Sequence, residues 1–200
     1  DMTREMVDVM AESPKVARHM HLPVQHGDNE MLRRMNRGYT IEHFEEMVDY
    51  VREKMPDIVL TTDLITGFPG ETEEMHRKTL ELLKKVRFDS AYTFIYSPRK
   101  GTPAASMDNQ IPDDIKHRRL NEIMEVQNQI SLEINKEQEG KTVEILVEGP
   151  TRQDENHWFG RTSGNKMVVF PKCENVAVGD LVMARIKTAQ TWLFKGELVR

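Results

Sequence analysis

Three short segments of the sequence combine chemically active side chains with glycine or proline. They are QHGDNE at residues 25–30, TGFPGE at 66–71 and SPRKGTP at 97–103. Each segment follows an apolar run and has the composition of a turn. Because the loops after parallel strands form the active face of β/α folds, we expect these segments to lie together and to carry any site.

Asp63 lies just before the second of these segments, in the β-rich run at 58–65. Strand alternation puts Thr61, Asp63 and Ile65 on one side. A carboxylate on an inner sheet face is costly unless it is paired or hydrogen-bonded. Asp63 is therefore either a structural group bonded to a neighbouring segment or a ligand contact. Arg99, in the third segment, could pair with Asp63 or contact an anionic substrate.

Other polar groups surround the first segment. Gln25 can both donate and accept hydrogen bonds, as a ribose or an amino-acid group requires. Arg33 and Arg37 fall at helical spacing, which suits either a solvated face or a clamp for a carboxylate or phosphate. His19 and His21 share a strand face, but no third metal ligand is evident nearby. A histidine of the core or of a barrel lumen is therefore the simpler interpretation.

The elements that must position these groups alternate between strand and helix. Strands are predicted at 16–25, 58–65 and 91–96, and helices after the N-capping residues Asp28, Thr40 and Thr72. Strands joined by helical crossovers imply a parallel sheet. An open doubly wound sheet and part of a β/α barrel both fit this order.

The pattern changes at Pro112. Helical spacing predicts a long helix to about Gln138, which Gly140 would end. Short runs of alternating polar and apolar residues follow, separated by turns, and they predict a small OB-like antiparallel barrel. We therefore expect one domain at 1–139 and a second at 140–200.

Composition excludes several protein classes. No apolar run in the 200 residues approaches the roughly 20 that span a bilayer, so we expect no membrane contact. The single cysteine, Cys173, cannot form an intrachain disulfide or build an iron–sulfur site alone, and a reducing, cytoplasmic setting is expected. The net charge is −7 over residues 1–140 and +2 over 141–200. This asymmetry weakly favours nucleic-acid binding by the second domain.

Aromatic and basic residues interleave in the second domain. The candidates for RNA contacts are Trp158, Arg161, Lys166, Trp192 and Lys195. OB-like barrels stack bases on aromatic rings and neutralise phosphates with lysine and arginine. Each aromatic residue taken singly could equally fill the core of a small barrel, so spacing alone does not establish RNA binding.

Longer strings in the sequence resemble a known family. HLPVQHGDNEMLRRMNRGYT, TTDLITGFPGET and FIYSPRKGTPAA, in this order, resemble the radical S-adenosylmethionine (SAM) methylthiotransferases, and GRTSGNKMVVFP and TAQTWLFKGELV resemble their closing TRAM domain. The likeness is greatest to the MiaB-type branch, which methylthiolates isopentenyladenosine next to the tRNA anticodon. It implies an α/β plus all-β fold: the second half of a radical SAM (β/α) partial barrel, followed by a small OB-like TRAM barrel.

The resemblance also implies roles for individual residues. SAM would be contacted by Gln25, His26, Arg33, Arg37, Asp63, Ile65, Gly67, Phe94 and Tyr96, and Arg99 would lie towards the substrate. His26 stands where relatives often have serine. In the family reaction one SAM donates a methyl group to sulfur. A second SAM is cleaved reductively to a 5′-deoxyadenosyl radical, which abstracts hydrogen from the adenine carbon. The implied partner is the anticodon stem-loop of tRNA.

The two [4Fe–4S] clusters of the family have no ligands in this sequence. Their six cysteines belong to an N-terminal domain and a CxxxCxxC loop, and Cys173 matches none of them. We therefore expect a fragment of a longer enzyme, inactive alone and without catalytic or metal-binding residues. Half a barrel would expose two sheet edges, which a homo-oligomer could cover.

Two alternatives to the interpretation as a tRNA methylthiotransferase stay open. A related enzyme methylthiolates an aspartate of a ribosomal protein, in which case the barrel would meet a protein. The chain could also be a non-catalytic RNA-binding module. The string GRTSGNKMVVF and the mildly positive charge of residues 141–200 favour tRNA.

Overall fold

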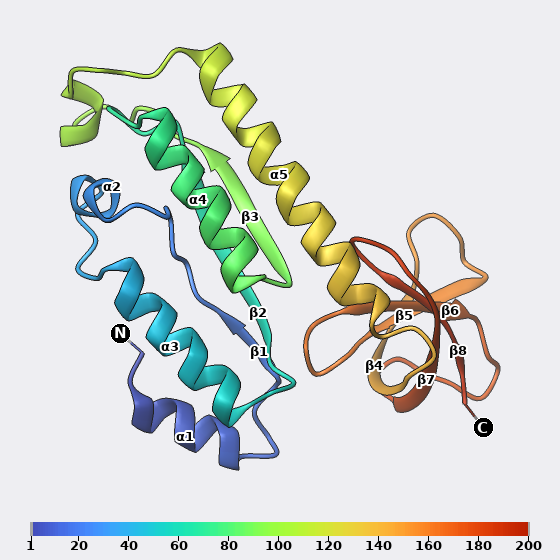
Figure 1. The fold of residues 1–200 in the computed structure, drawn as a ribbon. Helices are drawn as coiled ribbons and strands as arrows, with labels where there is room; N and C mark the ends of the chain where they lie inside the picture. Colours follow the sequence, from blue (N-terminus) through green and yellow to red (C-terminus); the bar gives the residue numbers. More distant parts are fainter. Residues whose placement is uncertain (1, 200) are drawn as a thin grey trace. The chain divides into compact units, whose positions relative to one another are not determined.

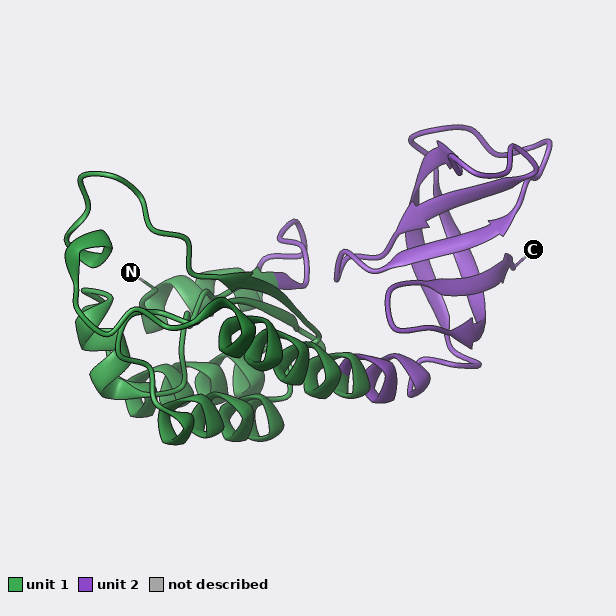
Figure 2. Ribbon diagram, turned by 90° about the horizontal axis from the view of Figure 1, so that it is seen from above, with its two compact units in different colours: residues 1–12, 20–130 green, residues 13–19, 131–200 purple. Residues whose placement is uncertain are grey.

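The computed structural model describes residues 2–199, which divide into two compact units (Figures 1 and 2). Unit 1 consists of Asp1–Glu12 and Met20–Ile130, and unit 2 of Ser13–His19 and Ser131–Arg200. The domain boundary at 139–140 stays a prediction. No helix within residues 2–199 has the length and apolar character needed to cross a membrane.

The first part of the chain alternates strands and helices. The elements are α1 (Arg4–Glu12), β1 (His19–His21), α2 (Asn29–Arg34), α3 (Ile41–Lys54), β2 (Val59–Thr66), α4 (Glu73–Val86), β3 (Ser90–Ile95), the 3₁₀ turn η1 (Pro103–Ser106) and α5 (Asp113–Lys136). The strands form a sheet in the order β1-β2-β3. β2 and β3 are parallel, with Asp63 opposite Tyr92 and Ile65 opposite Phe94. The predicted parallel sheet is confirmed.

The helix starts follow directly from local chemistry. The side chains of Asp28, Thr40 and Thr72 accept hydrogen bonds from the backbone N–H groups of Met31, His43 and Met75. Each bond satisfies one of the N–H groups that a first helical turn leaves without a partner. The three predicted N-caps are therefore confirmed.

Two local predictions are wrong. The strand predicted at 16–25 is regular only over His19–His21, because Pro23 lacks an N–H group and Gln25 adopts a φ of 67°. α2 ends at Arg34 and Asn36 is left-handed, with a φ of 57°. Arg33 and Arg37 therefore do not share a helix face. The helix α1 was not predicted at all.

The two faces of the sheet differ. On β2, Leu60 and Leu64 are buried, whereas Asp63 and Ile65, which point to the other side, are partly exposed. The buried side packs on the helices of unit 1 (Figure 2). The other side is open, and Phe94 on β3 is 50% exposed there.

Unit 2 contains a closed barrel with the strand order β4-β5-β6-β8-β7. Its strands are β4 (Thr142–Pro150), β5 (His157–Arg161), β6 (Met167–Pro171), β7 (Leu181–Ala189) and β8 (Phe194–Leu198). The core is entirely apolar and includes Ile145, Val168, Phe170, Ile186 and Phe194. The predicted combination of a parallel α/β segment with a small β-barrel is confirmed.

Candidate functional site

The open sheet face brings together three of the residues predicted to contact a cofactor. Asp63, Ile65 and Phe94 occupy neighbouring positions on β2 and β3. The Oδ1 atom of Asp63 lies 3.3 Å from Nε2 of His21, and Nδ1 of His21 lies 2.9 Å from the Thr61 hydroxyl. The carboxylate of Asp63 thus pairs with a histidine on the adjacent strand. This face offers an apolar surface beside a polar pair, which suits a ligand that combines a flat ring with hydrogen-bonding groups.

Two further predicted residues lie near the carboxyl ends of the strands. The backbone of buried Gln25 joins β2, donating to the Asp63 carbonyl and accepting from Ile65 N–H. Tyr96 packs its ring on Phe68, with the centroids 4.9 Å apart. Its hydroxyl is buried and has no hydrogen-bond partner among residues 2–199. Such a group costs free energy, so a ligand that supplied a hydrogen bond here would be favoured.

His26, by contrast, is fully buried within unit 1. Its Nδ1 accepts a hydrogen bond from the N–H of Asp28, and its Nε2 lies 2.9 Å from Oε1 of Glu71. The other oxygen of Glu71 accepts from Gly67 N–H at 2.6 Å and from Nη1 of Arg119 at 2.8 Å. His26 therefore belongs to an internal network that joins the loops after β1 and β2 to α5.

The charge of Glu71 is central to this network. Burial alone would raise the pKa of its carboxyl group. The hydrogen bonds from His26 and Gly67 and the charge of Arg119 outweigh burial and hold the pKa below its ordinary value. Glu71 is thus a buried carboxylate at neutral pH. Sequence reasoning missed both Glu71 and Arg119. The position of Glu71 in the glycine-rich turn was a usable signal, but nothing local marks Arg119.

The two glycines of this turn accommodate side chains of the protein itself. Gly67 and Gly70 have φ angles of 76° and 80°. A Cβ atom on Gly67 would lie 2.4 Å from Cγ of Lys116, and one on Gly70 would lie 2.0 Å from Nη1 of Arg34. The close approach that these glycines permit is therefore made by Lys116 and Arg34.

The three predicted arginines of unit 1 lie in different settings. Nη2 of Arg33 is 2.7 Å from Oε1 of Glu30, and hydrogen bonds from Arg33 and Arg34 lower the pKa of Glu30 to about 2. Arg37 follows α2 and lines a surface pocket of about 700 Å³. Arg99 is exposed in the loop after β3. The structure thus does not bring these arginines to one place, and their ligand roles stay predictions.

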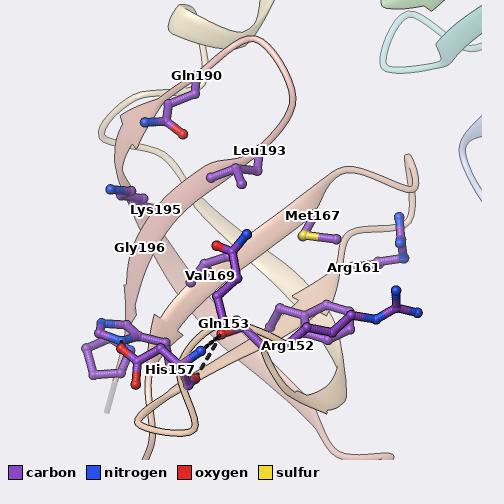
Figure 3. A pocket seen from close by; sticks show the side chains of 14 residues that line it. Arg152, Gln153, His157, Arg161, Met167, Val169, Gln190, Leu193, Lys195 and Gly196 are labelled. Carbon is purple, nitrogen blue, oxygen red and sulfur yellow. Dashed lines mark hydrogen bonds and ion pairs between the residues drawn. The ribbon is translucent and has the colours of Figure 1, made fainter.

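The barrel carries a separate concavity of about 910 Å³, formed mainly by the outer faces of β5, β6 and β8 (Figure 3). Arg161 and Lys195, two of the predicted RNA-binding residues, line it. Phe159, Met167 and Val169 add apolar side chains to the lining, and Figure 3 shows Met167 and Val169 between the two cations. Cationic and apolar side chains therefore line the same concavity.

The other three predicted RNA-binding residues lie outside this concavity. Trp158 packs against the barrel core, because strand alternation turns it away from the side that carries Phe159. Nζ of Lys166 is 3.0 Å from Oδ1 of Asn135 in α5. Trp192 is 67% exposed between β7 and β8. Phe159 was missed because the sequence does not show which of two adjacent aromatic residues faces outward.

The residues of this chain do not fit an iron–sulfur cluster. Within residues 2–199, no group of three or more His, Cys, Asp or Glu side chains is arranged to hold a metal ion. The single cysteine, Cys173, is exposed. The iron–sulfur clusters of the resembled family therefore have no ligands among the described residues.

Comparison with known families decides between the folds that the sequence left open. Residues 1–83 match the model of the radical SAM superfamily, and residues 136–199 match that of the TRAM domain. The chain is a radical SAM segment followed by a TRAM domain. The predicted order of a radical SAM portion and a TRAM domain is confirmed, and so is the predicted fold class.

Several curated proteins are similar to the radical SAM–TRAM chain over its whole length. The tRNA-2-methylthio-N(6)-dimethylallyladenosine synthases of Carboxydothermus hydrogenoformans and Moorella thermoacetica are 50% and 51% identical to it over 199 residues. These matches cover 100% of the chain and 45% of each relative. The chain thus spans less than half the length of these curated relatives.

A solved structure shows a similar arrangement. Coproporphyrinogen III oxidase (HemN) from Escherichia coli, described as a radical SAM enzyme, matches with a TM-score of 0.55 and 18% sequence identity. The match covers 82% of this chain and 44% of HemN. At this identity, the likeness supports the fold alone.

Proposed function

We propose that this chain is part of a radical SAM methylthiotransferase that modifies N6-dimethylallyladenosine, also called isopentenyladenosine, in tRNA. The observation that carries the proposal is the identity of 50% and 51% to synthases named for that product, over the radical SAM segment and the TRAM domain alike. The cluster ligands would come from residues outside this chain. We therefore expect the 200 residues by themselves not to cleave SAM.

The open sheet face of unit 1 fits SAM. When bound, SAM supplies a methyl group and, after reductive cleavage, the radical that abstracts hydrogen. Ile65 and Phe94 would contact its adenine, and Asp63, held by His21, would accept a hydrogen bond. The Tyr96 hydroxyl, buried without a partner within residues 2–199, would gain one. Gln25 holds the adjoining strand end in place through its backbone bonds.

The remaining roles are proposed on the family resemblance. Arg33 and Arg37 are candidates for the carboxylate of SAM, and exposed Arg99 for an anionic group of the substrate. Buried His26 would act by supporting Gly67 through Glu71, since its own ring has no exposed surface. The tRNA anticodon stem-loop is the proposed partner, and the cytoplasm the proposed setting.

A chimeric enzyme tests this function. These 200 residues would replace the matching part of the Moorella thermoacetica synthase, which is 51% identical over that region. After anaerobic reconstitution, the chimera should produce 2-methylthio-N6-dimethylallyladenosine in tRNA, as measured by mass spectrometry of nucleosides. Asp63→Asn should lower the yield, whereas Asp114→Asn, on the exposed side of α5, should not. A chimera that cleaves SAM but modifies only a ribosomal protein would refute tRNA as substrate.

A further inference from the structure

Four exposed apolar side chains lie together on the outer face of β4 and β7, which are neighbouring antiparallel strands (Figure 1). Leu146 stands opposite Leu181, and strand alternation puts Met183 on the same side as Leu181. Val199 lies beside Met183, whose carbonyl accepts a hydrogen bond from the Val199 N–H. These four side chains, which we call the β4–β7 patch, are between 43% and 64% exposed. Apolar side chains that gather on a surface, rather than scatter singly, mark interaction sites.

Acidic side chains border the β4–β7 patch. Glu144 and Glu148 flank Leu146 on the outer side of β4, and Asp180 lies just before β7. All three are exposed, and Glu148 pairs with Arg161 at 3.1 Å. The patch is therefore apolar with an acidic border, although residues 141–200 as a whole carry a net charge of +2.

The basic residues farther along β7 face an acidic one. Arg185 stands opposite Glu197 on β8, and Nζ of Lys187 lies 2.6 Å from Oε1 of Glu197. Their charges are therefore partly offset where they lie, and they do not reverse the acidic border of the patch.

A basic and apolar segment of the chain already lies beside this face. Ser13–His19 belongs to unit 2, and the N–H of Arg18 donates to the Ser163 hydroxyl at 2.9 Å. A pocket of about 610 Å³ is lined by Lys15 and Val16 from this segment and by Glu144, Leu146, Glu148 and Leu181 from the barrel. The face thus accommodates a short non-helical segment that combines an apolar side chain with a cation.

We propose that the β4–β7 patch docks a protein partner through a segment in which apolar side chains are flanked by lysine or arginine. The apolar side chains would cover Leu181 and Met183, and the cations would meet Glu144 and Asp180. The acidic border would repel the phosphates of RNA, and a symmetric contact with a second copy would bring like charges together. The inference goes beyond the proposed function and does not depend on it.

Methionine methyl groups allow a direct test with the 200-residue chain. Met183 belongs to the patch, whereas Met167 on β6 lines the other concavity of the barrel. With ¹³C-methyl methionine, a peptide of two leucines between lysine pairs should shift the Met183 signal and leave that of Met167 in place. The same peptide with glutamate for lysine should not move Met183. An unmoved Met183 signal, or equal responses to the two peptides, would overturn the inference.

Two further titrations decide between kinds of partner. A shift of the Met183 signal with single-stranded oligouridine would assign the face to RNA. A shift with rising protein concentration would assign it to a second copy of the chain. We expect neither, and either result would overturn the proposal.

Matched apolar variants locate the site. Leu181→Ser removes an exposed leucine of the patch, so the lysine peptide should bind about five-fold more weakly or worse. Val9→Ser, which changes a side chain of similar exposure on α1, should leave binding unchanged. Equal effects of the two variants would indicate non-specific apolar attraction and contradict the proposal.

Glu144→Gln tests the acidic border. The substitution should weaken binding of the lysine peptide about two-fold and reduce its dependence on salt, because one exposed charge is lost at the contact. Glu125→Gln, an equal charge change on the exposed side of α5, should do neither. If the two variants behaved alike, overall charge and not this border would attract the peptide, and the proposed site would be wrong.

Discussion

Unit 1, the sheet unit, and unit 2, the barrel unit, place their charged side chains in different ways. In the sheet unit, Glu71 and Arg119 are 3% exposed and bind each other inside the fold. In the barrel the core is wholly apolar, and Arg161 and Lys195 lie on the outer surface. Charges thus organise backbone loops inside the first unit and lie on the outer surface in the second, where Arg161 pairs with Glu148.

The difference predicts opposite consequences of substitution. A buried charge that loses its partner is strongly destabilising, whereas an exposed charge contributes little to stability. Changes to the internal network of unit 1 should therefore be measured as losses of stability. Changes to the outer face of the barrel should be measured as losses of affinity.

The largest expected effect is that of Glu71→Gln. The substitution removes the buried carboxylate that binds Nη1 of Arg119 and leaves the buried guanidinium paired only with the half-exposed Glu73, so unit 1 should lose about 3 kcal/mol of stability. Amide hydrogen exchange separates the units: protection should fall in β2 and stay constant in β7. A change below about 1 kcal/mol in the free energy of opening measured for β2 amides would show that the buried pair does not stabilise the fold.

A smaller effect is expected for Gly67→Ala. The new methyl group would meet the Lys116 side chain at a position where φ is already 76°, and we expect a loss of about 2 kcal/mol. Gly101→Ala is the matched control, since φ there is 86° but nothing lies within 4 Å of its Cβ position. Equal losses for the two variants would assign the whole effect to backbone strain.

The pH dependence of stability should also differ between the units. Because the pKa of Glu71 is lower in the folded chain than in the unfolded one, its contribution is complete above the ordinary glutamate pKa and is lost as pH falls through the folded value. Unit 1 should therefore weaken in acid, and Glu71→Gln should flatten this slope. An unchanged acid slope in β2 hydrogen exchange would contradict the assignment.

The smallest expected effect on stability is that of Lys195→Gln. Its side chain lies on the outer face of β8, so the free energy of unfolding of the barrel should change by no more than about 0.5 kcal/mol. Denaturant unfolding followed at β7 checks this value. A loss comparable to that of Glu71→Gln would remove the contrast between the units.

Local features were predictable from the sequence because their causes are local. Asp28, Thr40 and Thr72 cap helices through bonds to residues three positions away. Alternation along β2 correctly put Asp63 and Ile65 on one face. These predictions needed only the spacing of residue types along a single element.

The features that escaped prediction depend on distant partners or on small backbone changes. Glu71 meets Arg119 across 48 positions of the chain, a pairing that no periodicity encodes. One left-handed residue, Asn36, separates Arg33 from Arg37. On β5, a choice between two adjacent aromatic residues determines that Phe159, and not Trp158, faces the concavity.

The most direct test of the account is the nucleoside composition of tRNA treated with the chimeric enzyme. We predict 2-methylthio-N6-dimethylallyladenosine with the unsubstituted chimera and a marked loss with Asp63→Asn. A chimera that holds its clusters and cleaves SAM, yet leaves the adenosine unmodified, would contradict it.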